Sequence, residues 1–190
     1  VEHRKLISSL LDDSTLDRKL FWRDANGIPM TETPEVRWID KGGVLHLVAS
    51  ENYQETLENA VPELSKSILS KFGSCNMQIG SADLALTESD IVHDYFIPSL
   101  IVGRKKSADQ KFEAANELEK REIIRQMIFN SMLNECDTWG IDPTPLEQVE
   151  NHIYIKRIKE LPGASFTGSD RCRRRLRYSV DFMMPLQLQG

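Results

Sequence analysis

Arginine residues gather near the end of the chain and are the residues with the clearest chemical potential. Between 171 and 177 the sequence reads RCRRRLR, so Arg173, Arg175 and Arg177 are spaced by two. On a β-strand this spacing places side chains on one face at intervals of about 7 Å. Guanidinium groups this close repel one another unless carboxylates or phosphates lie opposite them. Contact with anions is therefore one explanation of this basic strand.

Three interpretations of the basic strand are open. Contact with a nucleic-acid backbone needs only positive charge and no recognition of bases. Ion pairing to acidic residues, on a neighbouring strand or another subunit, is favoured by the 29 acidic residues of the chain. Few aromatic residues accompany the arginines for base stacking, which also favours ion pairing. The third interpretation is a solvated face of an ordinary strand.

A metal-dependent nuclease is a competing hypothesis. Such enzymes place an acidic pair and a lysine on adjacent strands, where they bind a cation and orient water. Asp94 begins an expected strand, and Lys156 or Lys159 lies on another. However, no acid-x-Lys element falls on an expected strand: the segment at 109–111 (DQK) has the spacing, but a helix is expected to begin there. This position argues against a nuclease of that kind.

Other catalytic motifs are missing from the sequence. It has no GxxxxGK[ST] or GxGxxG phosphate loop. The segment GASFTG at 163–168 is similar to a nucleophile elbow, but its second glycine comes one residue too late and it joins two expected strands. Glu88, Asp90, His93 and Asp94 could hold a divalent cation, although a solvated turn is the favoured interpretation. We therefore expect a protein that is not an enzyme and that needs no cofactor or metal.

Apolar residues near the middle of the chain are candidates for contact with another subunit. A long helix is expected over 109–136, and its second half is apolar almost all round. Met127 and Ile128 lie in that half, which must be buried in the core or against a neighbouring subunit. Trp139, in a proline-rich loop, is the other candidate anchor. A tryptophan that folds back onto its own core is an equally good interpretation.

The elements that must position these residues begin with strands. Residues 176–184 alternate between apolar and polar side chains, which predicts an antiparallel strand with one buried face. Ile153 and Ile155 indicate the strand before it. The run DYFIPSLIVG at 94–103 predicts a strand covered on both faces, and its Pro98 indicates a sheet edge or a bulge.

The N-terminal half supplies helices and a hairpin. Two short apolar runs predict a β-hairpin over 36–49, and the spacing of apolar residues over 57–72 predicts a helix that ends at Gly73. The element order predicts an α+β fold with an antiparallel or mixed sheet and two to three packed helices. We expect a single domain over residues 1–190, with a helical N-terminal arm over residues 1–23.

Composition and charge narrow the class of protein further. The chain has 190 residues, a net charge of −5 and 40% hydrophobic residues, which is ordinary globular usage. No apolar run is long enough to span a bilayer, so we expect no membrane contact. Residues 171–190 hold five arginines and one acid, a charge of +4, so the remainder carries −9. This asymmetry suits self-association or an acidic partner.

The second half of the chain resembles the end of bacteriophage tail terminator proteins. Those proteins run from a strand to a long helix and then to a closing β-hairpin. The corresponding segments here are DYFIPSLIVG, REIIRQMIFNSMLNE, HIYIKRIKEL and RRRLRYSVDF. The basic entry into the last segment is similar to that of the sheath terminators of contractile tails.

This resemblance implies a structural role. Tail terminators form hexameric rings that cap the tail tube or sheath and connect it to the head, and they catalyse nothing. It therefore implies copies of this chain, tail tube, sheath and connector proteins as partners. It also implies location in the virion tail or neck after assembly in the host cytoplasm, with DNA only incidentally near. The alternative is a small nucleic-acid-binding or nuclease domain that uses the basic strand over residues 171–177.

Overall fold

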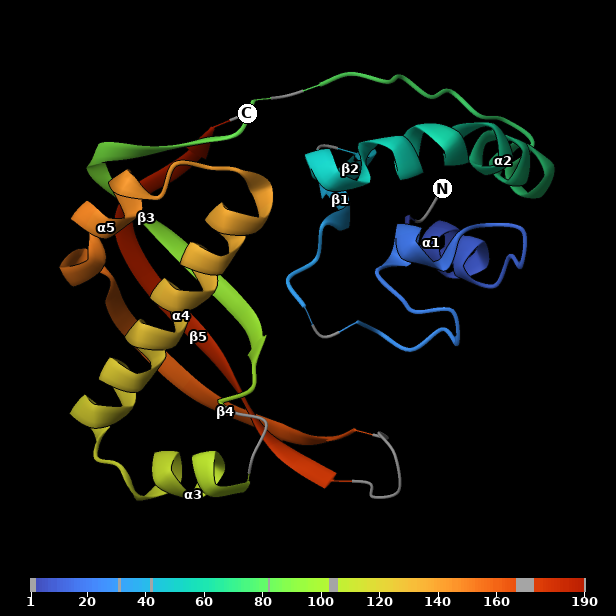
Figure 1. Ribbon diagram of the computed structural model, residues 1–190. Helices are drawn as coiled ribbons and strands as arrows, with labels where there is room; N and C mark the ends of the chain where they lie inside the picture. The colour runs from blue at the N-terminus through green and yellow to red at the C-terminus, as the bar shows by residue number, and fades with distance from the viewer. Residues whose placement is uncertain are drawn as a thin grey trace. The chain divides into compact units, whose positions relative to one another are not determined.

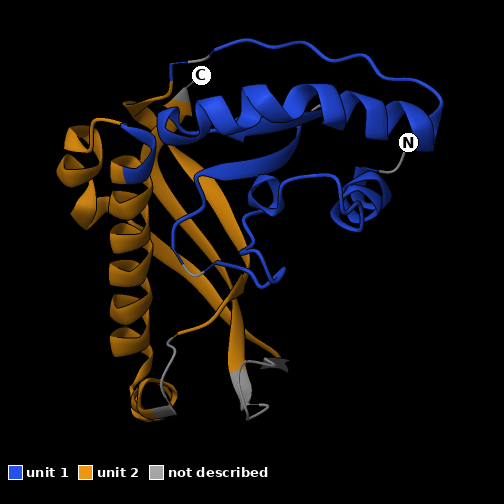
Figure 2. Cartoon of the chain, turned by 45° about the vertical axis from the view of Figure 1, so that its right-hand side comes forward, with its two compact units in different colours: residues 1–83, 138–140 blue, residues 84–137, 141–190 orange. Residues whose placement is uncertain are grey.

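The computed structural model describes residues 3–30, 32–41, 43–81, 83–102, 106–166 and 173–189. The chain divides into two compact units (Figure 2). Unit 1 comprises residues 1–83 and 138–140, and unit 2 comprises residues 84–137 and 141–190. The expected single domain with a helical N-terminal arm stays a prediction.

Unit 1 packs two α-helices and a β-hairpin around a small apolar core. Leu6, Leu10 and Leu16 meet Leu64 in this core, and Trp38 packs against them. The predicted hairpin and the predicted helix end are confirmed, since Gly73 has a φ of +75° and its N–H donates to the Leu69 carbonyl. The elements are α1 (His3–Leu11), η1 (Arg18–Phe21), β1 (Val36–Lys41), β2 (Val44–Ala49), η2 (Glu51–Tyr53) and α2 (Gln54–Phe72).

Unit 2 is a three-stranded antiparallel sheet with α4 lying across one face (Figure 1). The strand order is β3-β5-β4, so the last strand of the chain is the central one. The elements are β3 (Ala85–Leu100), α3 (Lys106–Ala114), α4 (Glu117–Trp139), α5 (Thr144–Gln148), η3 (Glu150–His152), β4 (Tyr154–Phe166) and β5 (Arg173–Gln189).

The alternation predicted for the last strand sets the core of unit 2. From Tyr178 to Leu186, every second side chain of β5 is buried, and these side chains pack against three apolar residues of α4. Each fully buried side chain of this size stabilises the fold by about 1.5–3 kcal/mol. The predicted α+β class with an antiparallel sheet is confirmed. The residues concerned are Tyr178, Val180, Phe182, Met184 and Leu186 of β5 with Ile124, Ile128 and Phe129 of α4.

The single long helix predicted over 109–136 is wrong, because two helices occupy this stretch. Asn116 begins the second one by a reciprocal cap: its Oδ1 accepts from the Glu119 N–H at 3.0 Å, and its own N–H donates to the Glu119 carboxylate at 2.8 Å. This capping box lies inside the charged first half of the helix expected over 109–136. α4 then continues to Trp139 instead of giving way to a loop.

The strand predicted over 94–103 begins earlier and is not covered on both faces. β3 starts at Ala85, and Phe96 is 60% exposed. The prediction for Pro98 is confirmed, because β3 is an edge strand and its register with β5 shifts between Ile97 and Leu100. Within the described residues, no helix has both the length and the apolar character needed to cross a membrane.

Candidate nucleic-acid interface

The sheet of unit 2 has a face that α4 does not cover, which we call the open face. Backbone pairing sets Asp94 opposite Met183 and Met183 opposite Tyr154. The next row of the same face holds Phe96, Asp181 and Arg157. The open face includes Asp94, Phe96, Tyr154, Lys156, Arg157, Lys159, Leu161, Arg177, Ser179, Asp181 and Met183.

Two ion pairs cross the strands on the open face. Lys156 Nζ lies 2.8 Å from Asp94 Oδ1, and Arg157 Nε lies 2.6 Å from Asp181 Oδ2. Lys156 lies at an irregularity in the β4–β5 register, between Ile155 and Arg157. The side chains of Lys156 and Arg157 can therefore both lie on the open face, although the two residues are consecutive. Asp94, Phe96, Lys156, Arg157 and Asp181 line a common surface depression.

These ion pairs are exposed and therefore exchangeable. The Arg157 side chain is 71% exposed and the Lys156 side chain 43% exposed. Exposed ion pairs contribute about 0–1 kcal/mol, because water solvates the charges well. Asp94 is 72% exposed, whereas Asp181 is 27% exposed and therefore less well solvated. A phosphate oxygen can replace either carboxylate at little cost. The pairs hold the cations in place without neutralising the face.

Positive charge prevails on the open face. Among its described side chains are four cations (Lys156, Arg157, Lys159 and Arg177) and two acids (Asp94 and Asp181). Arg177 is half-buried, and its Nε has no hydrogen-bond partner among the described residues. A buried N–H without an acceptor costs free energy, so this guanidinium favours a nearby anion.

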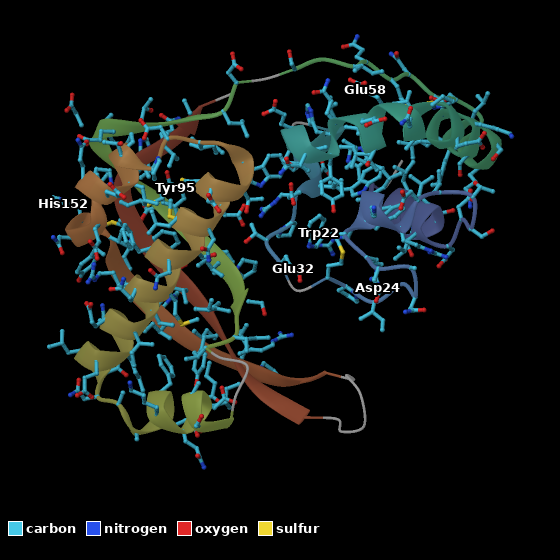
Figure 3. All side chains as sticks on the ribbon, viewed as in Figure 1. Trp22, Asp24, Glu32, Glu58, Tyr95 and His152 are labelled. Atoms are coloured by element: carbon cyan, nitrogen blue, oxygen red, sulfur yellow. The ribbon has the colours of Figure 1, made fainter. Side chains whose placement is uncertain are left out.

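The tyrosines of the covered face are held in the protonated form. Tyr95, labelled in Figure 3, donates a hydrogen bond to the Leu186 carbonyl, and burial raises the pKa of its hydroxyl. Burial also raises the pKa of Tyr178. The negative charges of Glu160, Glu113 and Asp109 raise it further, by smaller amounts. Neither tyrosine is therefore a base near neutral pH.

The residues predicted to meet a partner lie in different surroundings. Arg173 and Arg175 are in β5, paired with Phe166 and Ala164, and their side chains lie outside the described part of the structure. Arg177 is on the open face. Ile128 is 4% exposed in the core of unit 2, and Met127 packs against that core. Trp139 is half-buried at the end of α4.

The structure brings together only some of the residues that the nuclease hypothesis names. Asp94 and Lys156 form an ion pair, and Lys159 is exposed further along β4. The DQK segment lies inside α3, as expected for a helix. His93 Nε2 lies 3.1 Å from Ser89 Oγ, and the described residues contain no cluster of three or more groups suited to a metal. Residues 167 and 168 of the GASFTG segment lie outside the described residues.

Sequence reasoning missed three residues of the open face. The apolar patterns assign Phe96 and Tyr154 to strands without marking either as exposed, although they are 60% and 58% exposed. Arg157 is not singled out by them either, although the run KRIK at 156–159 is a basic segment within a strand. That run, together with the alternation of β5, is the signal by which the face could have been found.

A family model described as "Cas6_csf5: Type IV CRISPR-associated endonuclease Csf5" matches residues 3–190, nearly the whole chain. The chain belongs to this family. No curated protein matches it. A solved structure described as "Csf5, CRISPR-Cas type IV Cas6 crRNA endonuclease" is similar in fold, with a TM-score of 0.57 and 16% identity. The similarity covers 98% of this chain and 85% of that one.

Membership of the Csf5 family corrects the functional predictions. The resemblance to phage tail terminators is wrong, and so is the expectation that the chain is not an enzyme, because the family is one of endonucleases. The hexameric tail ring, the tail tube, sheath and connector partners, and the virion location are wrong for the same reason. A strand, a helix and a β-hairpin occur in many unrelated proteins, so their order carried no functional information.

Proposed function

We propose that the protein is an endonuclease that acts on CRISPR RNA and binds it on the open face of the unit 2 sheet. The observation that carries the proposal is the match of residues 3–190 to an endonuclease family. The similar solved structure is that of a crRNA endonuclease, which suggests RNA as the substrate. This is close to the alternative drawn from the basic strand over residues 171–177.

Positive charge on the open face supports RNA binding. Lys156, Arg157 and Lys159 lie along β4, and Arg177 follows on the neighbouring strand. Such a row of cations can follow a phosphate backbone and release its counterions. Arg173 and Arg175 continue β5 beyond Arg177, so we include the basic strand in the proposed binding surface.

The same cations suit the cleavage step. Attack on a phosphodiester increases the negative charge on the phosphate oxygens, and fixed cations stabilise that charge. An arginine can hold two phosphate oxygens at once through its planar guanidinium group. The exposure of the Arg157 side chain and its ion pair with Asp181 support this role for Arg157.

Cleavage of an end-labelled RNA that contains the cognate CRISPR repeat tests the proposal. The wild-type protein should cut this RNA at one position, seen on a denaturing gel. The double variant Lys156→Ala/Arg157→Ala should cut it at least about tenfold more slowly, as expected when charges that stabilise the reacting phosphate are removed.

The matched control is Arg4→Ala/Lys66→Ala, which removes two exposed cations from unit 1. It should cut the RNA at the wild-type rate. The proposal is overturned if the wild-type protein leaves repeat RNA intact. The assignment to the open face is overturned if the two double variants behave alike.

A further inference from the structure

Among the residues whose side chains the structure describes, the exposed aromatic rings occur on a single surface. Nearly all aromatic rings of these residues are buried or half-buried. The two exceptions are Phe96, 60% exposed, and Tyr154, 58% exposed. Both lie on the open face, one on each edge strand. Exposure of a large ring costs free energy in water, so two on one face point to a ligand.

Neither ring is held by another aromatic ring in the described part of the chain. Aromatic contacts occur elsewhere, as between Tyr95 and Phe182 on the covered face, where the ring centroids are 5.3 Å apart. Phe96 and Tyr154 take part in none of these contacts. Their faces are therefore available for stacking.

The spacing of the two rings suits unpaired bases. Phe96 and Tyr154 lie two strands apart and in successive rows of the open face. Strand spacing and rise then give about 12 Å between their Cα atoms. Neighbouring bases of a duplex are about 3.4 Å apart and stack on one another, so they offer no free face to such rings. An extended single strand can place one base on each.

We propose that Phe96 and Tyr154 are stacking platforms for two unpaired bases of an RNA strand whose phosphates follow Lys156, Arg157 and Lys159. This inference rests on the proposed function and adds the class of substrate, a single-stranded segment. Antiparallel sheets that bind RNA use exposed strand aromatics in this way.

Charge selects RNA over an apolar protein partner for this surface. Lys156 and Arg157 line the same depression as Phe96, so a ligand on that ring must also tolerate two cations. Each nucleotide has a flat base that can stack on an aromatic ring and a phosphate that can bind a cation. The core of a protein interface is instead depleted in charged residues.

Fluorescence anisotropy of the full chain with labelled RNA tests the inference. The probes are a single-stranded oligouridine of about twelve nucleotides and a blunt RNA duplex of similar length. Phe96→Leu and Tyr154→Leu keep apolar bulk but remove the ring. Each should weaken binding of the single strand by roughly fivefold to 100-fold. Binding of the duplex should change by less than about twofold, because its phosphate contacts remain.

Ring-retaining variants and a surface control make the test specific. Phe96→Tyr and Tyr154→Phe should bind the single strand as the wild type does. So should Leu118→Ala, which alters an even more exposed side chain on α4. Thermal melting confirms that each variant is folded.

The outcomes separate the inference from the proposed function. If the wild type cuts repeat RNA but the two leucine variants bind oligouridine normally, the inference is overturned and the function stands. Equal losses in the leucine and ring-retaining variants also overturn it, because the aromatic ring is then not what binds. If the wild type neither binds nor cuts any RNA, both proposals fail together.

Discussion

The two faces of the unit 2 sheet are built from the same strands, but one is buried in the core and the other is exposed. Tyr95 and Phe96 are neighbours on β3, yet Tyr95 stacks on Phe182 while Phe96 is 60% exposed. On β5, Val180 and Phe182 are buried, whereas Asp181 between them holds Arg157. The period of two divides one strand between a stabilising face and the face that we propose binds RNA. Within a regular stretch of strand, the face on which a residue lies is thus set by its parity, and the irregularity at Lys156 shifts that parity on β4.

The difference also separates the forces that act on each face. The covered face gains from apolar burial, which is large per residue and insensitive to salt. The open face carries exposed ion pairs of Lys156 and Arg157, which contribute little to stability and are screened by salt. Substitutions on the covered face should therefore change the free energy of unfolding, and substitutions on the open face should change the affinity for RNA.

Truncation of a ring on each face should give the largest contrast. Phe182→Ala removes a side chain that is 5% exposed and leaves a cavity, so it should lower the free energy of unfolding by about 3–5 kcal/mol. Phe96→Ala should lower it by less than about 1 kcal/mol. Urea unfolding followed by circular dichroism measures both. Equal losses would show that the open face is covered by other parts of the folded protein.

Removal of the basic strand should weaken RNA binding through electrostatics. The triple variant Arg173→Ser/Arg175→Ser/Arg177→Ser removes up to three phosphate contacts. Each contact to single-stranded RNA contributes about 0.7 to the slope of log affinity against log salt, so the slope should fall by about 2. Anisotropy at several salt concentrations gives the slope.

A charge-matched triple variant serves as the control. Arg4, Lys19 and Lys66 are exposed cations of unit 1, and their replacement by serine removes the same net charge. The salt slope should then stay near the wild-type value. If both triple variants reduce the slope equally, net charge rather than the basic strand determines the affinity.

Removal of an acid from the open face should have the smallest effect and the opposite sign. Asp181→Asn frees Arg157 from its carboxylate partner. Affinity for RNA should rise by roughly threefold, about the free energy of one exposed ion pair. Glu63→Gln, which alters an exposed ion pair in α2, should leave it unchanged. Weaker binding by Asp181→Asn would mean that this carboxylate positions Arg157 for RNA.

Local patterns predicted much of the fold. The strict alternation over 176–184 identified the central strand and its buried face, because a strand buried on one side must alternate. Gly73 marked the end of α2, because a residue there adopts positive φ. The break between α3 and α4 at Asn116 was not predicted, because its signal is a reciprocal cap of four residues inside a charged helical stretch.

The candidate site was predicted only in fragments. The sequence offered Asp94, Lys156 and the basic strand as separate features, and the pairing of β3 and β4 with β5 brought them to one face. Lys156 reaches Asp94 across 62 positions of sequence, which no local pattern encodes. The exposure of Phe96 depends on which face of β3 the helices cover.

The amino-acid sequence by itself determined the elements of unit 2 and the two-sided character of β5, because hydrophobic periodicity and capping act over a few neighbouring residues. Tertiary structure alone decided that Phe96, Tyr154 and the cations of β4 share a surface. Register across strands and the position of α4 are set by packing between residues far apart in the chain, and that packing selects which side of the sheet stays open.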